Sequence, residues 1–224
     1  MLSRKYQAAL LLLPLFWSFI LVASEMYRPG YFMGSDPNEE LLHFFGGWAI
    51  RILLLSYALA GLNRWLPKLR LLQSRRMVGL FAFFYLVLHF LTYVTLFVEP
   101  KWDVLMDEVI QRPYITVGAM ALALLCSMAL TSTDRARRMM GVYWKKLHGL
   151  IHLAVPLALI HYFWALKVVN LELVVYLSIF IFVVLERVSN NVRKVTRSRI
   201  KKLSLIHISE PTRQAEISYA VFCL

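Results

Sequence analysis

Several histidines lie in long apolar stretches of this sequence, where each imidazole needs a chemical partner. His148, His152 and His161 fall within WKKLHGLIHLAVPLALIHYFW, residues 144–164, and His89 falls within a separate apolar stretch. A polar group that stays unsatisfied in hydrocarbon carries a large free-energy cost, so histidines inside membrane spans are candidates for function. An imidazole can bind a metal ion or a haem iron, and it can relay a proton.

The apolar residues are grouped into stretches that predict membrane-spanning helices. Of the 224 residues, 59% are hydrophobic, and the formal net charge is +12. A membrane core of about 30 Å takes about 20 apolar residues in a helix. We assign six spans, at residues 6–23, 41–62, 77–98, 114–131, 147–168 and 171–185. The sequence therefore predicts an all-α fold, an integral membrane bundle of six helices, rather than a soluble domain.

Charged residues between these spans alternate in sign from one loop to the next. Basic residues dominate after the second, fourth and sixth spans: Arg64, Lys68, Arg70, Arg75 and Arg76, then Arg135, Arg137, Arg138, Lys145 and Lys146, then the tail from Arg187 to Lys202. The other two loops carry Glu25, Asp36, Glu39 and Glu40, and Glu99, Asp103, Asp107 and Glu108. Because basic loops stay on the cytoplasmic side, both termini are predicted to be cytoplasmic.

His89 and His161 fall at the same predicted depth in two different spans. His89 lies 12 residues into the third span, roughly 18 Å from its cytoplasmic end. His161 lies 14 residues into the fifth span, roughly 21 Å from the same side. Two histidines at one level on two helices can clamp a haem iron, so we predict that both bind haem. A hydrogen bond to a neighbouring helix is the alternative for each of them.

His148 lies near the cytoplasmic boundary of the same span as His161. On a straight helix the two side chains would point about 140° apart, and a kink at Pro156 would re-aim them. His152 is one turn from His148 and on the same face, and we interpret it as a packing or hydrogen-bonding residue.

Arg51 is the other costly residue inside a span, roughly 15 Å below the outer surface and near the level of the two histidines. No acidic residue falls at that depth in any predicted span, so we expect a haem propionate as its anion. Snorkelling, or pairing with backbone carbonyls, is the alternative. Arg75 and Arg76 at the inner face could hold a second propionate or a flavin phosphate, or serve only as topology signals.

The final segment, LSLIHISEPTRQAEISYAVFCL, does not continue the pattern of the spans. It has no amphipathic helical period and is too polar for a seventh span. It resembles translated sequencing-adapter read-through, so we expect residues 203–224 to lie outside the native fold and residues 1–202 to form the transmembrane domain.

Five stretches, in order and spacing, carry a resemblance to a known family: RPGYFMGSDPNEELLHFFGGWAIR, SRRMVGLFAFFYLVLHFLTY, QRPYITVG, TSTDRARRMMGVYWKKLHGL and IHYFWALK. Together they resemble the ferric-reductase-like transmembrane family, over about residues 26–202. The resemblance implies a bacterial inner-membrane protein that binds haem b and FMN, with His89, His148 and His161 as the haem histidines. Relatives with a second haem have a further histidine about 13 residues earlier in the third span. That position is Arg76 or Arg75 here, so we expect no second bis-histidine haem.

In function, the resemblance implies an electron-transfer subunit. Electrons would pass from the cytoplasmic side or the quinone pool to a periplasmic molybdopterin-dependent catalytic subunit, which reduces methionine sulfoxide in oxidised proteins. Quinol or a cytoplasmic flavin reductase would be the donor, because the sequence holds no dinucleotide fingerprint such as GxGxxG. The sulfoxide chemistry itself would belong to the partner.

Two other functions fit the same residues. A six-span transporter or proton relay would use the intramembrane histidines and Arg51, and it would hold no chromophore. An intramembrane metal enzyme would bind zinc through His148, His152 and His161. That enzyme would lack a nearby carboxylate for general-base catalysis, and His161 would lie about 14 Å away along the helix axis.

Overall fold

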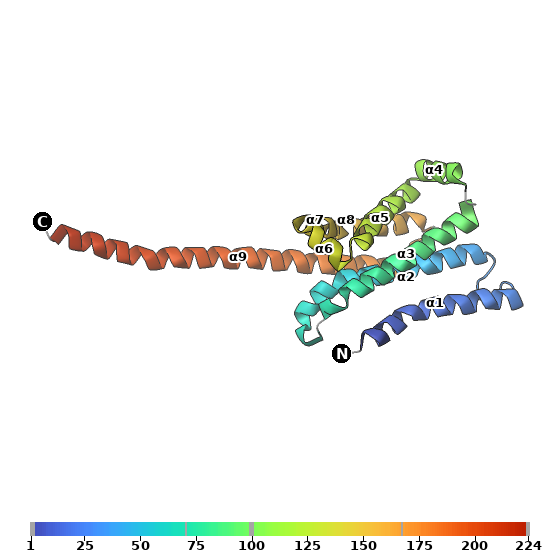
Figure 1. Ribbon diagram of the computed structural model, residues 1–224, viewed down its shortest axis with the longest axis horizontal. Coiled ribbons are helices and arrows are strands. Elements are labelled where there is room, and N and C mark those ends of the chain that lie inside the picture. Colours follow the sequence, from blue (N-terminus) through green and yellow to red (C-terminus); the bar gives the residue numbers. More distant parts are fainter. Residues whose placement is uncertain (1–2, 70, 99–100, 167, 223–224) are drawn as a thin grey trace. The chain divides into compact units, whose positions relative to one another are not determined.

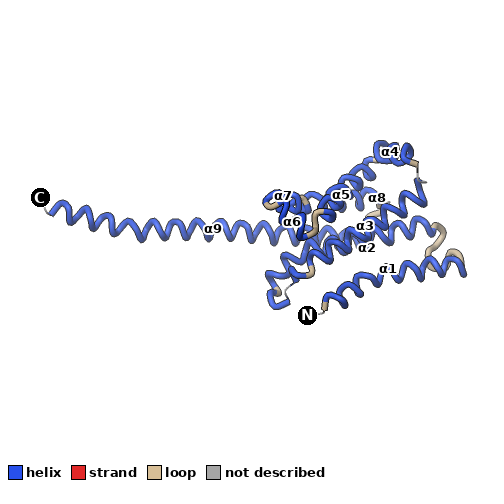
Figure 2. Tube along the Cα trace, in the orientation of Figure 1, coloured by secondary structure: helices blue, strands red, loops and turns tan. Residues whose placement is uncertain are grey.

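The protein is helical throughout the part that the structure describes (Figures 1 and 2). The computed structural model describes residues 3–69, 71–98, 101–166 and 168–222, and it places side chains for residues 3–68, 71–98, 101–166, 168–198 and 200. No β-strand occurs within these residues, which confirms the prediction of an all-α fold.

In chain order the helices are α1 (Arg4–Tyr27), α2 (Pro37–Trp65), α3 (Arg75–Tyr93), α4 (Trp102–Gln111), α5 (Pro113–Leu130), α6 (Asp134–Met140), α7 (Val142–Gly149), α8 (Ile151–Ala165) and α9 (Leu171–Phe222). Two short 3₁₀ helices, η1 (Pro67–Leu69) and η2 (Leu71–Gln73), lie between α2 and α3. A π-helical turn, η3 (Val94–Val98), extends α3. The helices α4 and α6 fall in segments that we had expected to be loops.

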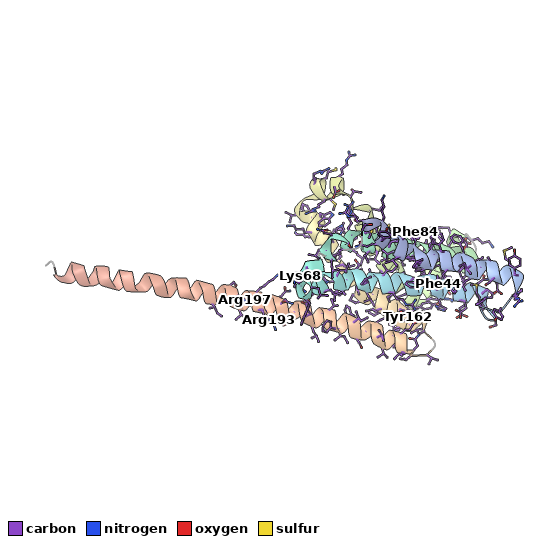
Figure 3. The ribbon with its side chains drawn as sticks, turned by 90° about the horizontal axis from the view of Figure 1, so that it is seen from below. Phe44, Lys68, Phe84, Tyr162, Arg193 and Arg197 are labelled. Atoms are coloured by element: carbon purple, nitrogen blue, oxygen red, sulfur yellow. The ribbon has the colours of Figure 1, made fainter. Side chains whose placement is uncertain are left out.

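Five helical segments in the described part of the chain are long and apolar enough to cross a membrane: Arg4–Tyr27, Pro37–Trp65, Arg75–Val98, Pro113–Leu130 and Val142–Ala165. They coincide with the first five predicted spans. Outward side chains on them are apolar, as expected for contact with lipid, and Phe84 of α3 is an example (Figure 3). The sixth predicted span, 171–185, forms the first turns of α9 and is not among the five, so six spans and cytoplasmic termini remain predictions.

The chain divides into two compact units, Met1–Phe180 and Ile181–Leu224. The first contains α1 to α8 and the beginning of α9. The second is the remainder of α9, which carries exposed basic residues such as Arg193 and Arg197 (Figure 3). The side chains of the anomalous segment 203–224 lie outside the described residues.

Two pairs of helices build the core of the first unit. The helices α2 and α3 pack along each other, and α5 packs along α8 (Figure 1). The helix α2 begins where Asp36 accepts hydrogen bonds from the backbone N–H groups of Asn38 and Glu39, with Pro37 in its first turn. Both features are strong helix-start signals. It supplies the most buried surface of the unit, including Ile52, Leu54 and Tyr57.

The helix α1 is attached to α3 through one buried tyrosine. Tyr85, which is 0% exposed, donates a hydrogen bond to the Leu11 carbonyl at 2.7 Å and accepts one from the Leu15 N–H at 3.2 Å. These two groups would normally bond each other, because they are four residues apart in a helix. Pro14 lies inside α1 at this point, and the Tyr85 hydroxyl contacts both groups beside it. The bridge secures an otherwise exposed helix to the bundle.

Candidate functional site

A cavity of about 550 Å³ lies among α2, α3, α5 and α8, with part of α4 at its border. This volume is within the range of about 300–1,000 Å³ that small-molecule sites occupy. Its walls are mostly apolar, with Ile50, Leu53, Leu86, Leu122, Leu125 and Ala158 among them. His89 of α3 and His161 of α8 both line it. The structure thus brings together the two histidines that were predicted to share one depth.

The two imidazoles are oriented by backbone carbonyls. His89 Nδ1 lies 2.9 Å from the carbonyl oxygen of Leu42, and His161 Nδ1 lies 2.7 Å from that of Tyr114. A carbonyl oxygen can only accept, so each Nδ1 must carry the proton and donate it. Each Nε2 is then left with its lone pair, which is the tautomer that binds a metal.

Each histidine ring lies against a glycine of the neighbouring helix, the same helix whose carbonyl it contacts. A Cβ on Gly46 of α2 would lie 2.9 Å from His89 Nδ1, and a Cβ on Gly118 of α5 would lie 2.7 Å from His161 Nδ1. Each glycine follows its carbonyl residue, Leu42 or Tyr114, by four positions, and in both cases the histidine lies 47 positions after that residue. The missing side chain lets the ring reach a carbonyl that is otherwise shielded within its helix. Both halves of the site therefore use the same arrangement, a backbone carbonyl and a glycine four residues later, to position a histidine ring.

The distance between the rings matches one shared metal ion. Their centroids are 6.3 Å apart and their planes meet at 73°. Imidazole nitrogens bind metals at about 2 Å, so two such bonds plus half a ring on each side span about 6 Å. No group of three or more His, Cys, Asp or Glu side chains in the described residues could hold a metal ion. Two imidazoles without a third side-chain ligand fit a haem, which would bring nitrogens of its own, better than a free-standing ion.

His148 and His152 occupy a different part of the bundle. His148 Nε2 lies 3.2 Å from Thr131 Oγ1, and its ring stacks on Trp144 with 4.1 Å between centroids. His152 Nδ1 lies 3.0 Å from the Tyr57 hydroxyl, in agreement with a packing or hydrogen-bonding role. Neither histidine is among the described residues that line the cavity. The zinc-enzyme alternative, which needs both of them with His161, has no support in this geometry.

The fifth predicted span is interrupted at Leu150, between α7 and α8. The Leu150 N–H bonds the Leu147 carbonyl, three residues back, instead of continuing the α-helical ladder. Pro156, where we had expected the reorientation, lies inside α8. The break therefore separates His148 from His161 earlier in the span than the proline signal indicated.

Arg51 has an acidic partner in the structure, which the sequence analysis did not expect. Its Nη2 lies 2.8 Å from Glu172 Oε1, and its Nε donates to the Tyr176 hydroxyl at 2.8 Å. The guanidinium also lies over Trp48, 5.2 Å from the ring centroid. Counting depth along single helices missed the pair because Glu172 lies in the first turn of α9 and a long arginine side chain extends toward it. Arg51 is not among the described residues that line the cavity, which removes the argument for pairing it with a propionate.

Arg75 and Arg76 lie away from this cavity, at the beginning of α3. Arg76 Nη1 forms an ion pair of 3.0 Å with Asp134 Oδ1, and the carbonyl oxygen of Arg75 accepts a hydrogen bond from Ser56.

Sequence reasoning missed a polar border of the cavity formed by α4 and the residue that follows it. Leu105, Glu108, Val109 and Arg112 all line the cavity. Arg112 Nε lies 2.9 Å from Glu108 Oε2, which also accepts a hydrogen bond from Tyr93 at 3.0 Å. The pKa of Arg112 is raised above its ordinary value, chiefly by its hydrogen bond to the Tyr114 hydroxyl. The spacing i, i+3, i+4, i+7 of these four residues is the helical signal that could have found them.

The sequence of this chain matches a known protein family. The family model described as ferric reductase like transmembrane component matches residues 45–159, about half of the chain. The heme-binding subunit MsrQ of the protein-methionine-sulfoxide reductase of Caulobacter vibrioides is 36% identical over 167 residues, which cover 74% of this chain and 80% of the relative. The chain belongs to the ferric-reductase-like transmembrane family.

Other similar proteins are also named as MsrQ heme-binding subunits. The MsrQ heme-binding subunit of Cronobacter sakazakii is 34% identical over 165 residues, 73% of this chain and 80% of the relative. That of Xanthomonas axonopodis pv. citri is 39% identical over 135 residues, 60% of this chain and 62% of the relative. The resemblance drawn from the five sequence stretches is thereby confirmed.

Proposed function

We propose that this chain is a membrane redox subunit that holds haem b between His89 and His161. The observation that carries the proposal is the pair of rings, 6.3 Å apart, each donating its Nδ1 proton to a backbone carbonyl, which leaves Nε2 of each ring as the ligating nitrogen. The relatives named as heme-binding subunits support the same cofactor. When bound, haem b would supply a one-electron iron couple.

The residues of the cavity would hold and tune such a cofactor. The carbonyls of Leu42 and Tyr114 fix the ring orientations and make each imidazole a more basic ligand. The apolar walls exclude water, which influences the reduction potential. Arg112 is the cationic side chain among the described lining residues, and we assign to it the propionate contact that the sequence had suggested for Arg51.

In this proposal, the subunit conducts electrons outward across the bacterial inner membrane, with both termini in the cytoplasm. The acceptor is a periplasmic molybdopterin-dependent catalytic subunit of the MsrP type, which reduces methionine sulfoxide in oxidised proteins. Quinol or a cytoplasmic flavin reductase supplies the electrons, and FMN acts on the cytoplasmic side. His148, with Arg75 and Arg76 near that side, belongs to the region where electrons enter. Residues 203–224 take no part.

A reduced-minus-oxidised optical spectrum of the purified full chain tests the central claim. We expect a b-type α-band in the wild type, its loss in His89→Ala and His161→Ala, and its retention in His152→Ala. A wild type that shows no such band after purification from haem-replete cells would reject the electron-transfer function. The transporter or proton relay would then be the leading alternative.

A further inference from the structure

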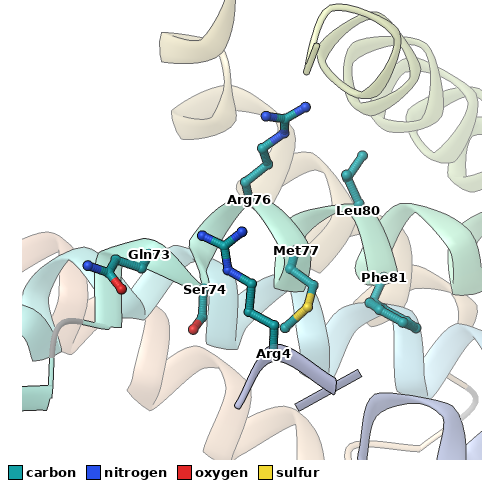
Figure 4. Close-up of a pocket in the computed structure, with 7 residues that line it drawn as sticks. All are labelled: Arg4, Gln73, Ser74, Arg76, Met77, Leu80 and Phe81. Atoms are coloured by element: carbon teal, nitrogen blue, oxygen red, sulfur yellow. The ribbon is translucent and has the colours of Figure 1, made fainter. Parts of the chain in front are cut away.

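A second cavity, of about 370 Å³, lies where α1 and α3 begin, apart from the histidine site. Figure 4 shows its lining: Arg4 from α1, Gln73 from the end of η2, Ser74 just before α3, and Arg76, Met77, Leu80 and Phe81 from the start of α3. The positive-inside pattern assigns this end of both helices to the cytoplasmic face of the membrane. A cavity at this level opens where phospholipid head groups meet the hydrocarbon.

The lining changes from cationic to apolar along α3. Ser74 directly precedes α3 and Arg76 belongs to its first turn, while Leu80 and Phe81 follow one turn later, roughly 6 Å deeper toward the membrane centre. The Arg4 side chain reaches the same cationic end from the neighbouring helix (Figure 4). A ligand that matches this lining carries an anionic group at one end and an apolar chain at the other.

Both guanidinium groups have donors available for an anion. Among the described residues, Arg4 forms no ion pair. Arg76 bonds Asp134 through Nη1 at 3.0 Å, but both side chains are more than half exposed, so water and ions readily compete for that contact. A guanidinium has five N–H donors, so the Asp134 contact leaves most of those of Arg76 for a second anion.

Two hydrogen-bonded ties hold the walls of this cavity in place. Ser74 Oγ donates to Gln7 Oε1 at 2.7 Å, which joins the start of α1 to the start of α3. The Tyr85 bridge to Leu11 and Leu15 joins the same two helices farther along. The two ties fix α1 against α3 on either side of the apolar part of the cavity.

We propose that this cavity binds an anionic phospholipid of the cytoplasmic leaflet. The phosphate lies between Arg4 and Arg76, and one acyl chain lies along Leu80 and Phe81. Basic pockets between membrane helices on the cytoplasmic side are a recurrent form of lipid recognition. The phospholipid would fasten α1 to the bundle at its cytoplasmic end, as Tyr85 does within the membrane.

Native mass spectrometry of the full chain in a non-ionic detergent tests the proposal, with phosphatidylglycerol and phosphatidylcholine of identical acyl chains as the probes. We expect one phosphatidylglycerol adduct per chain and at least tenfold weaker binding of phosphatidylcholine. One basic residue near an anionic lipid is worth about fivefold in affinity. Arg76→Gln should therefore bind about fivefold more weakly, and Arg4→Gln/Arg76→Gln about 25-fold.

The matched control is Arg135→Gln/Arg138→Gln, which removes the same charge from exposed residues of α6 outside the cavity. It should bind phosphatidylglycerol within twofold of the wild type, and circular dichroism should show equal helix content in all variants. Equal loss of binding in this control would overturn the proposal, because it would show a general charge effect. Displacement of the adduct by millimolar inorganic phosphate or FMN would also overturn it, because the site would then recognise the phosphate group without the lipid.

Discussion

Replacing Gly118 by alanine adds one methyl group beside His161. This change should weaken cofactor binding and leave the fold intact. In Gly118→Ala the new Cβ would lie 2.7 Å from His161 Nδ1 and 2.8 Å from Cε1. Non-bonded carbon contacts are comfortable at about 3.5–4.0 Å, so the ring must retreat by roughly 0.8 Å. That retreat weakens or breaks the hydrogen bond of 2.7 Å to the Tyr114 carbonyl.

The cost follows from two effects on the same ring. Overpacking of this kind costs about 1–3 kcal/mol, and a lost hydrogen bond costs about 0.5–1.5 kcal/mol. Their sum, about 1.5–4.5 kcal/mol, corresponds to a loss of about 10- to 2,000-fold in haem affinity. Metal sites tolerate ligand displacements of only about 0.2 Å, so a large part of this cost should fall on cofactor binding.

Gly149→Ala is the matched control, because a Cβ there would meet no atom within 4 Å and the same gain in helix propensity applies. Haem content by the pyridine haemochrome assay and haem titration of the stripped protein are the measurements. We expect Gly149→Ala to match the wild type and Gly118→Ala to lose haem while keeping its helical circular dichroism. If Gly118→Ala binds haem as tightly as Gly149→Ala does, the view that carbonyl-anchored histidines build the site is refuted. Gly46→Ala, whose Cβ would lie 2.9 Å from His89 Nδ1, should behave like Gly118→Ala.

Three other sets of variants test the arginines, the Tyr85 bridge and the C-terminal segment. Arg112→Gln should lower haem retention about tenfold through loss of a charge-assisted contact, whereas Arg51→Gln should lower thermal stability with haem retention unchanged; equal haem loss in both would contradict the assignment. Tyr85→Phe should cost about 0.5–1.5 kcal/mol for each of the two hydrogen bonds that it removes, and proteolysis should then release α1 faster; unchanged proteolysis would show that the bridge is not what secures α1. A chain ending at Lys202 should keep the wild-type spectrum and detergent elution volume, and loss of the α-band would show that residues 203–224 belong to the fold.

Hydropathy and helical rise were sufficient for the main features of the fold. Each of the first five predicted spans coincides with a helix, because a run of about 20 apolar residues has no other low-energy arrangement in a membrane. Depth counting also paired His89 with His161, since both positions depend only on a constant rise per residue along two helices of the same direction. The order and spacing of the five stretches were enough to indicate the family.

Hydropathy and the rise per residue could not predict the contacts between helices. A helix period does not show which neighbour a ring will face, so the carbonyl anchors at Leu42 and Tyr114 and the glycines beside them appear only once α2 packs on α3 and α5 on α8. The pairing of Arg51 with Glu172 depends on side-chain reach across helices, and no sequence pattern indicated it. The break at Leu150 and the place of Arg112 at the cavity are likewise visible only in the structure. The sequence by itself determined which residues share a depth in the membrane, and the tertiary structure decided which of them touch, because contact depends on the rotation and spacing of whole helices.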